Sequence, residues 1–149
     1  MGESVALINQ AISLISQLNQ VSVIKTARFY QTAAWGETQQ ADFINTAILV
    51  KTTLSASELL AEILNIENLM GRQRNKKWGP RLIDIDILLF GTHVVNQPQL
   101  TIPHPYITER NFVLLPLYDL NTTLLLPGKG KIGNYIHSKN INEGIITVL

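Results

Sequence analysis

Hydrophobic and polar positions alternate with different periods along the chain, and these periods predict the helices and strands. Across Glu3–Leu18 the apolar residues fall at helical spacing, with Asn, Gln and Ser on the opposite face, which predicts an amphipathic helix. Val21–Thr32 alternates in the manner of a strand, and Phe43–Thr52, rich in Ile and Val, predicts a second strand. We expect a loop over Ala33–Ala41 between them.

A capping box predicts where a second helix begins. Ser55 is followed by Glu58 at the spacing that lets each side chain bond the other's backbone N–H, and apolar positions then recur at helical spacing as far as Met70. Gly71 is a natural C′ residue, so we expect the helix to end there. An apolar strand is predicted next, over Leu82–Phe90.

The remainder of the chain is richer in loops. We expect Gly91-Thr92 to turn a hairpin into His93–Asn96, a short helix over Asn111–Asp119 and a turn over Pro127–Lys131. The order of elements predicts one α+β domain over residues 1–149, with both helices on one face of an antiparallel sheet. A ferredoxin-like split-βαβ sandwich would have the order βαββαβ, and its first strand is missing here.

Composition narrows the class of protein. The chain has 149 residues, no cysteine and a net charge of +1, which excludes a disulfide scaffold, Cys-ligated metal sites and a strongly basic nucleic-acid or membrane binder. No apolar run approaches the ~20 residues that span a bilayer, and the N-terminus lacks the basic region of a signal peptide. We therefore expect a soluble cytoplasmic protein. Charged residues make up only 15% of the chain, so each is informative.

A basic segment stands out. Residues 72–81 hold five of the twelve Lys and Arg residues and no acid, together with Trp78. A solvated loop is the ordinary explanation of such a run. A mobile lid that closes over an anionic ligand explains the presence of a large indole better.

Two carboxylates follow directly. Asp84 and Asp86 lie two residues apart in the predicted strand, so their side chains share one face with Cα atoms about 6.6 Å apart. Their repulsion calls for a positive group between them. That group is either Arg72 or Arg81 in an ion pair, or Mg²⁺, which binds one or two carboxylates together with substrate phosphates. A basic lid before an Asp-x-Asp strand favours nucleotide triphosphate chemistry.

These residues carry a resemblance to a known family. Residues 71–74 and 78–91 resemble the signature of the 6-hydroxymethyl-7,8-dihydropterin pyrophosphokinases, enzymes of folate biosynthesis that transfer pyrophosphate from ATP to a pterin alcohol and release AMP. The resemblance extends to residues 29–32, 42–45, 102–105, 110–114 and 116–117.

The resemblance implies a role for each matching residue. Two Mg²⁺ ions would lie on Asp84 and Asp86, and these two residues with Arg72 and Arg81 would form the catalytic set. The implied contacts to ATP come from Glu67, Arg72, Trp78, Arg81, Leu100, Thr101, His104 and Arg110. The implied contacts to the pterin come from Thr32, Ala34, Phe43, Asn45, Trp78 and Phe112, with the two phenylalanines on either side of the ring.

Simpler interpretations of some of these residues stay open. Phe43 and Phe112 are also explained as core residues, and His104 as a cap of the turn that follows it. No side chain stands out as a general base, so positioning and electrostatics would supply most of the catalysis.

The chain also departs from the family at its start. Met1-Gly2-Glu3-Ser4 matches only the end of the Gly-Ser-Asn-Leu-Gly turn that follows the family's first strand. Two explanations stay open: a start placed too late, or a truncated, inactive protein that serves as a scaffold or binding protein. A nucleic-acid-binding module is a further rival, which the acidic Asp84 and Asp86 argue against. We expect a monomer whose partners are small molecules.

Overall fold

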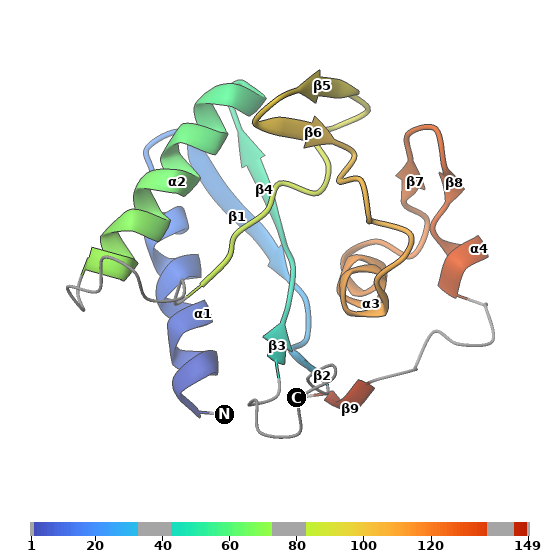
Figure 1. The fold of residues 1–149 in the computed structure, drawn as a ribbon, viewed down its shortest axis with the longest axis horizontal. Coiled ribbons are helices and arrows are strands. Elements are labelled where there is room, and N and C mark those ends of the chain that lie inside the picture. The colour runs from blue at the N-terminus through green and yellow to red at the C-terminus, as the bar shows by residue number, and fades with distance from the viewer. Residues whose placement is uncertain (1, 33–42, 73–82, 137–144, 149) are drawn as a thin grey trace.

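The structure is a computed structural model that describes residues 2–32, 43–72, 83–136 and 145–148. Two helices, α1 (Gly2–Ser16) and α2 (Ala56–Arg72), pack together on one face of an antiparallel ribbon made by β1 (Val21–Thr26) and β4 (Ile48–Thr52) (Figure 1). Apolar side chains from both helices and from β1 fill the space between them: Ala11, Ile15, Val21, Leu59, Ile63, Ile66 and Met70. The predicted α+β class is confirmed, while the ferredoxin-like topology and the missing first strand stay predictions.

The capping box forms as predicted, but α2 does not end at Gly71. The Ser55 N–H donates to Glu58 Oε1 at 2.9 Å, and the Glu58 N–H donates to Ser55 Oγ at 3.1 Å. The pKa of Glu58 is lowered because its carboxylate accepts the backbone N–H of Ser55. Gly71 lies within the helix, which continues to Arg72. Gly71 therefore lies in the last turn of α2 and is not the residue at which the helix ends.

Each of the two long strands predicted from the sequence is divided in two. Val21–Thr32 becomes β1 and β2 (Tyr30–Thr32), while the other long strand becomes β3 (Phe43–Asn45) and β4. At the break the Ala27 N–H donates to the Ala47 carbonyl at 2.9 Å. The expectation of continuous strands was wrong, because β1 and β4 pair in one sheet whereas β2 and β3 pair in another.

Beyond the break the ribbon continues into a second sheet. β2 pairs on one side with β3 and on the other with β9 (Ile145–Val148), both antiparallel. β9 is not among the strands predicted from the sequence. Its four residues come from the far end of the chain, so hydrophobic periodicity alone could not assign them a partner.

The structure assigns no strand to the acidic segment, residues 83–90. This corrects the predicted strand Leu82–Phe90, of which Leu82 lies outside the described residues. Two of its backbone groups bond outside any ladder: the Ile85 N–H donates to a side chain of α2, and the Leu88 carbonyl accepts the His104 N–H at 3.0 Å. Its isoleucines still pack against the core between α1 and α2.

The hairpin after this segment is displaced from its predicted place. Gly91, at φ +57°, makes a turn in which the His93 N–H donates to the Phe90 carbonyl at 3.0 Å. The strand that follows, β5 (Val95–Gln97), pairs with β6 (Leu100–Ile102) and not with residues before the turn. The expected hairpin into His93–Asn96 was therefore wrong.

A third helix, α3 (Asn111–Leu120), lies on the other side of the ribbon from α1 and α2 (Figure 1). The predicted helix is confirmed, and Pro116 lies buried inside it. The hairpin β7 (Leu125–Leu126) and β8 (Gly130–Lys131) confirms the predicted turn and leads into α4 (Gly133–Ile136). These elements enclose a second core made of Ala27, Ile107, Leu114, Leu117, Leu120, Leu126 and Ile132. Among the described residues, no helix combines the length and the apolar character needed to cross a membrane.

Candidate active site

The acidic segment forms one wall of a small cavity. Asp86, with Ile85 and Ile87 on either side, faces a space of about 230 Å³ that Thr101 of β6 and His104 close from the other side. The remaining lining residues are Leu60, Pro98, Gln99, Leu100 and Pro105. The cavity therefore combines apolar walls with a carboxylate, a hydroxyl and an imidazole, a lining that suits a ligand with both apolar and polar parts.

The two carboxylates keep the relationship that the sequence predicts, although the segment is not a strand. Asp84 and Asp86 are exposed, while the side chains of the isoleucines between and beside them are half-buried against the core. An extended backbone places alternate side chains on opposite sides, so both aspartates project away from the core. The segment thus presents two neighbouring negative charges to solvent beside the cavity.

Glu67 connects this segment to α2. Its Oε2 accepts the backbone N–H of Ile85 at 2.7 Å, a short bond of the kind that a charged acceptor makes. Ile85 lies between the two aspartates in the chain, so the bond fixes the backbone at the point from which both carboxylates project. The structure thus gives Glu67 a contact to protein backbone, whereas the resemblance implied a contact to ATP.

His104 has its two ring nitrogens in different roles. The Nδ1 atom accepts the Tyr106 N–H at 3.2 Å, so the neutral ring carries its proton on Nε2. This confirms the interpretation of His104 as a cap of the following turn. The same bond leaves Nε2–H as the donor of a side chain that lines the cavity. Capping the turn and binding an anion are therefore compatible roles.

Arg110 lies against two aromatic rings. Its guanidinium carbon is 4.9 Å from the ring centre of Tyr106 and 5.8 Å from the ring centre of Phe112, the second residue of α3. Contacts of this kind restrict a long side chain that would otherwise sample many rotamers. Sequence reasoning missed Tyr106. Its place between His104 and Arg110, two implied anion contacts, is the one signal in the sequence that pointed to it.

The residues implied in pterin binding come from two strands and one helix. Phe43 of β3 has 52% of its surface exposed, so its interpretation as a core residue was wrong. Asn45 on the same strand and Phe112 on α3 are half-buried, and Thr32 at the end of β2 is buried. α3 contacts both β2 and β3, which brings the three elements together.

Other implied site residues are not placed. Ala34, Trp78 and Arg81 lie outside the described residues, and Arg72 is described only as the last residue of α2. The basic lid therefore stays a prediction. Four of the residues implied in ATP binding are described at the cavity or on the turn beside it: Leu100, Thr101, His104 and Arg110.

Comparison with known proteins gives this geometry its context. Residues 1–122 match the family model of 7,8-dihydro-6-hydroxymethylpterin-pyrophosphokinase. The chain belongs to this family.

Relatives in the pyrophosphokinase family cover most of the chain. Proteins named 2-amino-4-hydroxy-6-hydroxymethyldihydropteridine pyrophosphokinase are similar over 80% of this chain in Haemophilus influenzae, at 38% identity, and in Bacillus subtilis, at 42%. The matched regions make up 75% and 72% of those proteins. The relative of that name in Aquifex aeolicus is 35% identical over 85% of this chain and 78% of its own length. All three carry an enzyme's name, so the alternative of an inactive scaffold finds no support among them.

Proposed function

We propose that this protein transfers the pyrophosphoryl group of ATP to 6-hydroxymethyl-7,8-dihydropterin, which gives AMP and the pterin pyrophosphate used in folate biosynthesis. The observation that carries the proposal is the exposed pair Asp84 and Asp86, of which Asp86 lines a cavity that His104 also lines. Membership of the pyrophosphokinase family supports the substrate pair.

The cavity between the acidic segment and β6 is the proposed site for ATP. Its apolar residues, Leu100 among them, would contact the adenine, and the donor His104 Nε2–H would bond a phosphate oxygen. Arg110, whose guanidinium Tyr106 and Phe112 hold in place, would add a cation for the phosphates. Its edge N–H groups suit paired phosphate oxygens, because a guanidinium donates from a rigid fork.

The acidic pair fits Mg²⁺. This ion binds through hard oxygen ligands and typically uses only one or two protein carboxylates, with phosphates and water as its other ligands. Within the described ranges no three His, Asp or Glu side chains gather into a metal site, so a fully protein-ligated ion would not suit this place. Asp84 and Asp86 would hold two ions, which when bound offset phosphate charge and lower the pKa of a coordinated hydroxyl.

The pterin would lie between β3 and the first turn of α3. The rings of Phe43 and Phe112 offer aromatic faces for a flat heterocycle, and the Asn45 amide can both donate to and accept from its edge. The exposure of Phe43 supports this role, because an aromatic ring half in water gains contact area when a ligand covers it.

Catalysis in this proposal comes from placement and charge. The sequence singles out no general base, so the enzyme would align the pterin hydroxyl for in-line attack on the β-phosphorus of ATP. Arg72 and Arg81 would balance charge on the transferred group, and Trp78 would help to exclude water. The roles of these three residues follow from the family resemblance alone.

The decisive experiment measures AMP release from ATP, with and without the pterin alcohol, in the presence of Mg²⁺. The wild-type protein should form AMP only when both substrates are present. Asp84→Asn and Asp86→Asn should each slow turnover by about two orders of magnitude or more with unchanged circular dichroism. Glu62→Gln, which removes a carboxylate from α2 outside this cavity, is the matched control and should keep its activity. Near-normal AMP release by either aspartate variant would refute the role of the acidic pair.

A further inference from the structure

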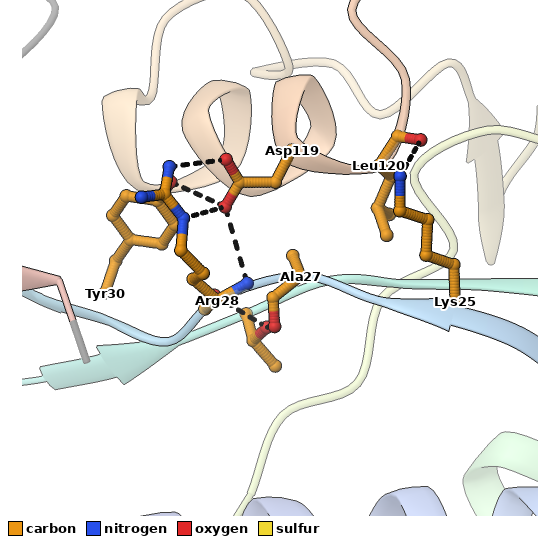
Figure 2. Close-up of polar contacts among 7 residues, drawn as sticks. Lys25, Ala27, Arg28, Tyr30, Asp119 and Leu120 are labelled. Carbon is orange, nitrogen blue, oxygen red and sulfur yellow. Dashed lines mark hydrogen bonds and ion pairs between the residues drawn. The ribbon is translucent and has the colours of Figure 1, made fainter.

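A network of hydrogen bonds joins the ribbon to the end of α3, outside the proposed substrate contacts. The Asp119 carboxylate accepts Arg28 Nη2–H on Oδ1 at 2.8 Å and Arg28 Nε–H on Oδ2 at 3.1 Å, the two-point contact that guanidinium and carboxylate make best (Figure 2). The Tyr30 hydroxyl donates to Oδ2 at 2.7 Å, and the Arg28 backbone N–H reaches the same atom at 3.4 Å.

Burial gives this network its importance. The Asp119 side chain is only 14% exposed, whereas that of Arg28 is 62% exposed. A largely buried carboxylate is unfavourable unless its oxygens are bonded, and here both are. Burial opposes ionisation of Asp119, yet the bonds from Arg28 and Tyr30 outweigh it and lower its pKa. The network therefore stays charged and fully bonded at neutral pH.

A second contact acts on the same end of the helix. Lys25 Nζ donates to the Leu120 carbonyl at 3.3 Å, beside Asp119 (Figure 2). An ammonium here also suits the negative end of the helix dipole. Two consecutive residues at the C-terminal end of α3 are thus held by three side chains, Lys25, Arg28 and Tyr30, from the region where β1 ends and β2 begins.

The elements joined in this way are those that carry the proposed pterin contacts. Tyr30 begins β2, whose last residue is Thr32, and β3 with Phe43 pairs directly with that strand. Asp119 lies near the end of the helix whose first turn carries Phe112. α3 is only ten residues long, so holding its C-terminal end also restricts where its first turn, with Phe112, can lie relative to β3.

We propose that Arg28, Tyr30 and Asp119 are positioning residues for the pterin pocket: they fix α3 against β2 and β3 and so set the spacing of the two aromatic faces. This inference rests on the proposed function for the identity of the ligand. None of the three residues is among those proposed to contact substrate. Their effect is therefore expected mainly on pterin affinity, with a smaller effect on ATP affinity because Arg110 lies against Phe112, and with the fold kept.

The test measures the Kd of 6-hydroxymethyl-7,8-dihydropterin in the presence of a non-hydrolysable ATP analogue, together with the KM for ATP and the melting temperature. Asp119→Asn keeps the shape of the side chain and removes its charge, and it should raise the pterin Kd by about three- to tenfold. Tyr30→Phe should have a smaller effect in the same direction. Arg28→Lys keeps the charge and loses the two-point contact. Its pterin Kd should lie between that of wild type and that of Arg28→Met.

A matched control separates positioning from general destabilisation. Ser55→Ala removes the cap of α2, which is far from α3 in sequence. It should lower the melting temperature by an amount comparable to that of Asp119→Asn, without changing the pterin Kd. Coupling is measured by a double-mutant cycle: Arg28→Met and Asp119→Asn together should weaken pterin binding no more than either does alone. Equal effects of Ser55→Ala and Asp119→Asn on the Kd would overturn the proposal, as would an additive double variant.

The design also distinguishes failure of this inference from failure of the proposed function. A wild-type protein that binds the pterin but releases no AMP would refute the proposed reaction, and the Kd comparison would still decide the positioning role. A wild-type protein that does not bind the pterin would overturn both. An AMP-forming wild type with an Asp119→Asn variant of unchanged pterin Kd would overturn the positioning role alone.

Discussion

The Glu67 carboxylate and the Ile85 backbone N–H are joined by a hydrogen bond of 2.7 Å. The bond crosses from α2 to the segment that carries Asp84 and Asp86, at the residue between them. A side chain here does what a neighbouring strand would do in a sheet, because it satisfies a backbone donor and fixes the direction of the chain. The Glu67 carboxylate therefore helps to fix the acidic pair, together with the isoleucines packed against the core.

Removing that carboxylate should disturb the acidic pair. In Glu67→Ala the Ile85 N–H loses a charged acceptor, a change that typically costs about 1.5–3 kcal/mol. We expect kcat for AMP release to fall by about tenfold or more while pterin affinity stays near wild type. Glu67→Gln keeps an acceptor oxygen and should lose less. Glu62→Ala on the same helix is the control, and equal activity of wild type and Glu67→Ala would contradict this role.

The two nitrogens of His104 can be tested separately. In His104→Asn the amide oxygen can take the place of Nδ1 as acceptor for Tyr106, so the free energy of unfolding should change by less than about 0.5 kcal/mol while the KM for ATP rises roughly tenfold. In His104→Gln the longer amide can donate from near the place of Nε2. It should keep more ATP affinity and lose about 1 kcal/mol of stability. Steady-state kinetics and urea unfolding would measure both, and the reverse ranking would exclude these assignments.

Ionisation of Tyr30 should lower the free energy of unfolding at alkaline pH. Burial, with the hydrogen bond to Asp119, raises its pKa from 10.0 to about 12. A raised pKa in the folded state means that the neutral phenol stabilises the fold below pH 10, and that this contribution is lost as the pH rises to about 12. Wild type should lose roughly 1–3 kcal/mol of unfolding free energy across this range beyond the loss seen in Tyr30→Phe. Parallel curves for the two proteins in urea titrations would show that Tyr30 does not titrate in this way.

The cap of α2 should matter for stability alone. Ser55→Ala leaves the Glu58 N–H without its side-chain acceptor and should lower the free energy of unfolding by about 1 kcal/mol. The kcat for AMP release and both KM values should stay within about twofold of wild type, because α2 is also held by its buried apolar face. Thermal unfolding and steady-state kinetics on the same preparation would check both parts. A fall in kcat that exceeds the loss of folded protein would show that the start of α2 affects the site.

The sequence predicts best those parts of the fold whose causes are local. The Ser55 and Glu58 cap, the helical faces and the alternation of Asp84 and Asp86 with isoleucines depend on neighbours within a few residues, and all three hold in the structure. The breaks in the two long strands escaped prediction, because the Ala27–Ala47 contact joins residues that are distant in sequence. Hydrophobic periodicity shows which face of a strand is apolar. It does not show which backbone N–H and C=O groups pair with another strand.

The candidate site divides in the same way. A charged pair in an apolar segment signals chemistry without any knowledge of the fold, so Asp84 and Asp86 could be selected from the sequence. Tyr106 and the Arg28–Asp119 network could not, since their roles arise from contacts made after folding. His104 shows an intermediate case: the turn cap was anticipated, but which nitrogen stays available follows only from the bond to Tyr106.

Pro116 inside α3 has a consequence for the residue one turn before it. Proline has no N–H, so the Phe112 carbonyl does not receive the bond that residue 116 of a regular helix would donate. The residue whose ring is proposed to cover the pterin therefore has a carbonyl that lacks its regular helical donor. A heterocycle with several N–H groups would suit such an acceptor, and Pro116→Ala would restore the helical donor to that oxygen.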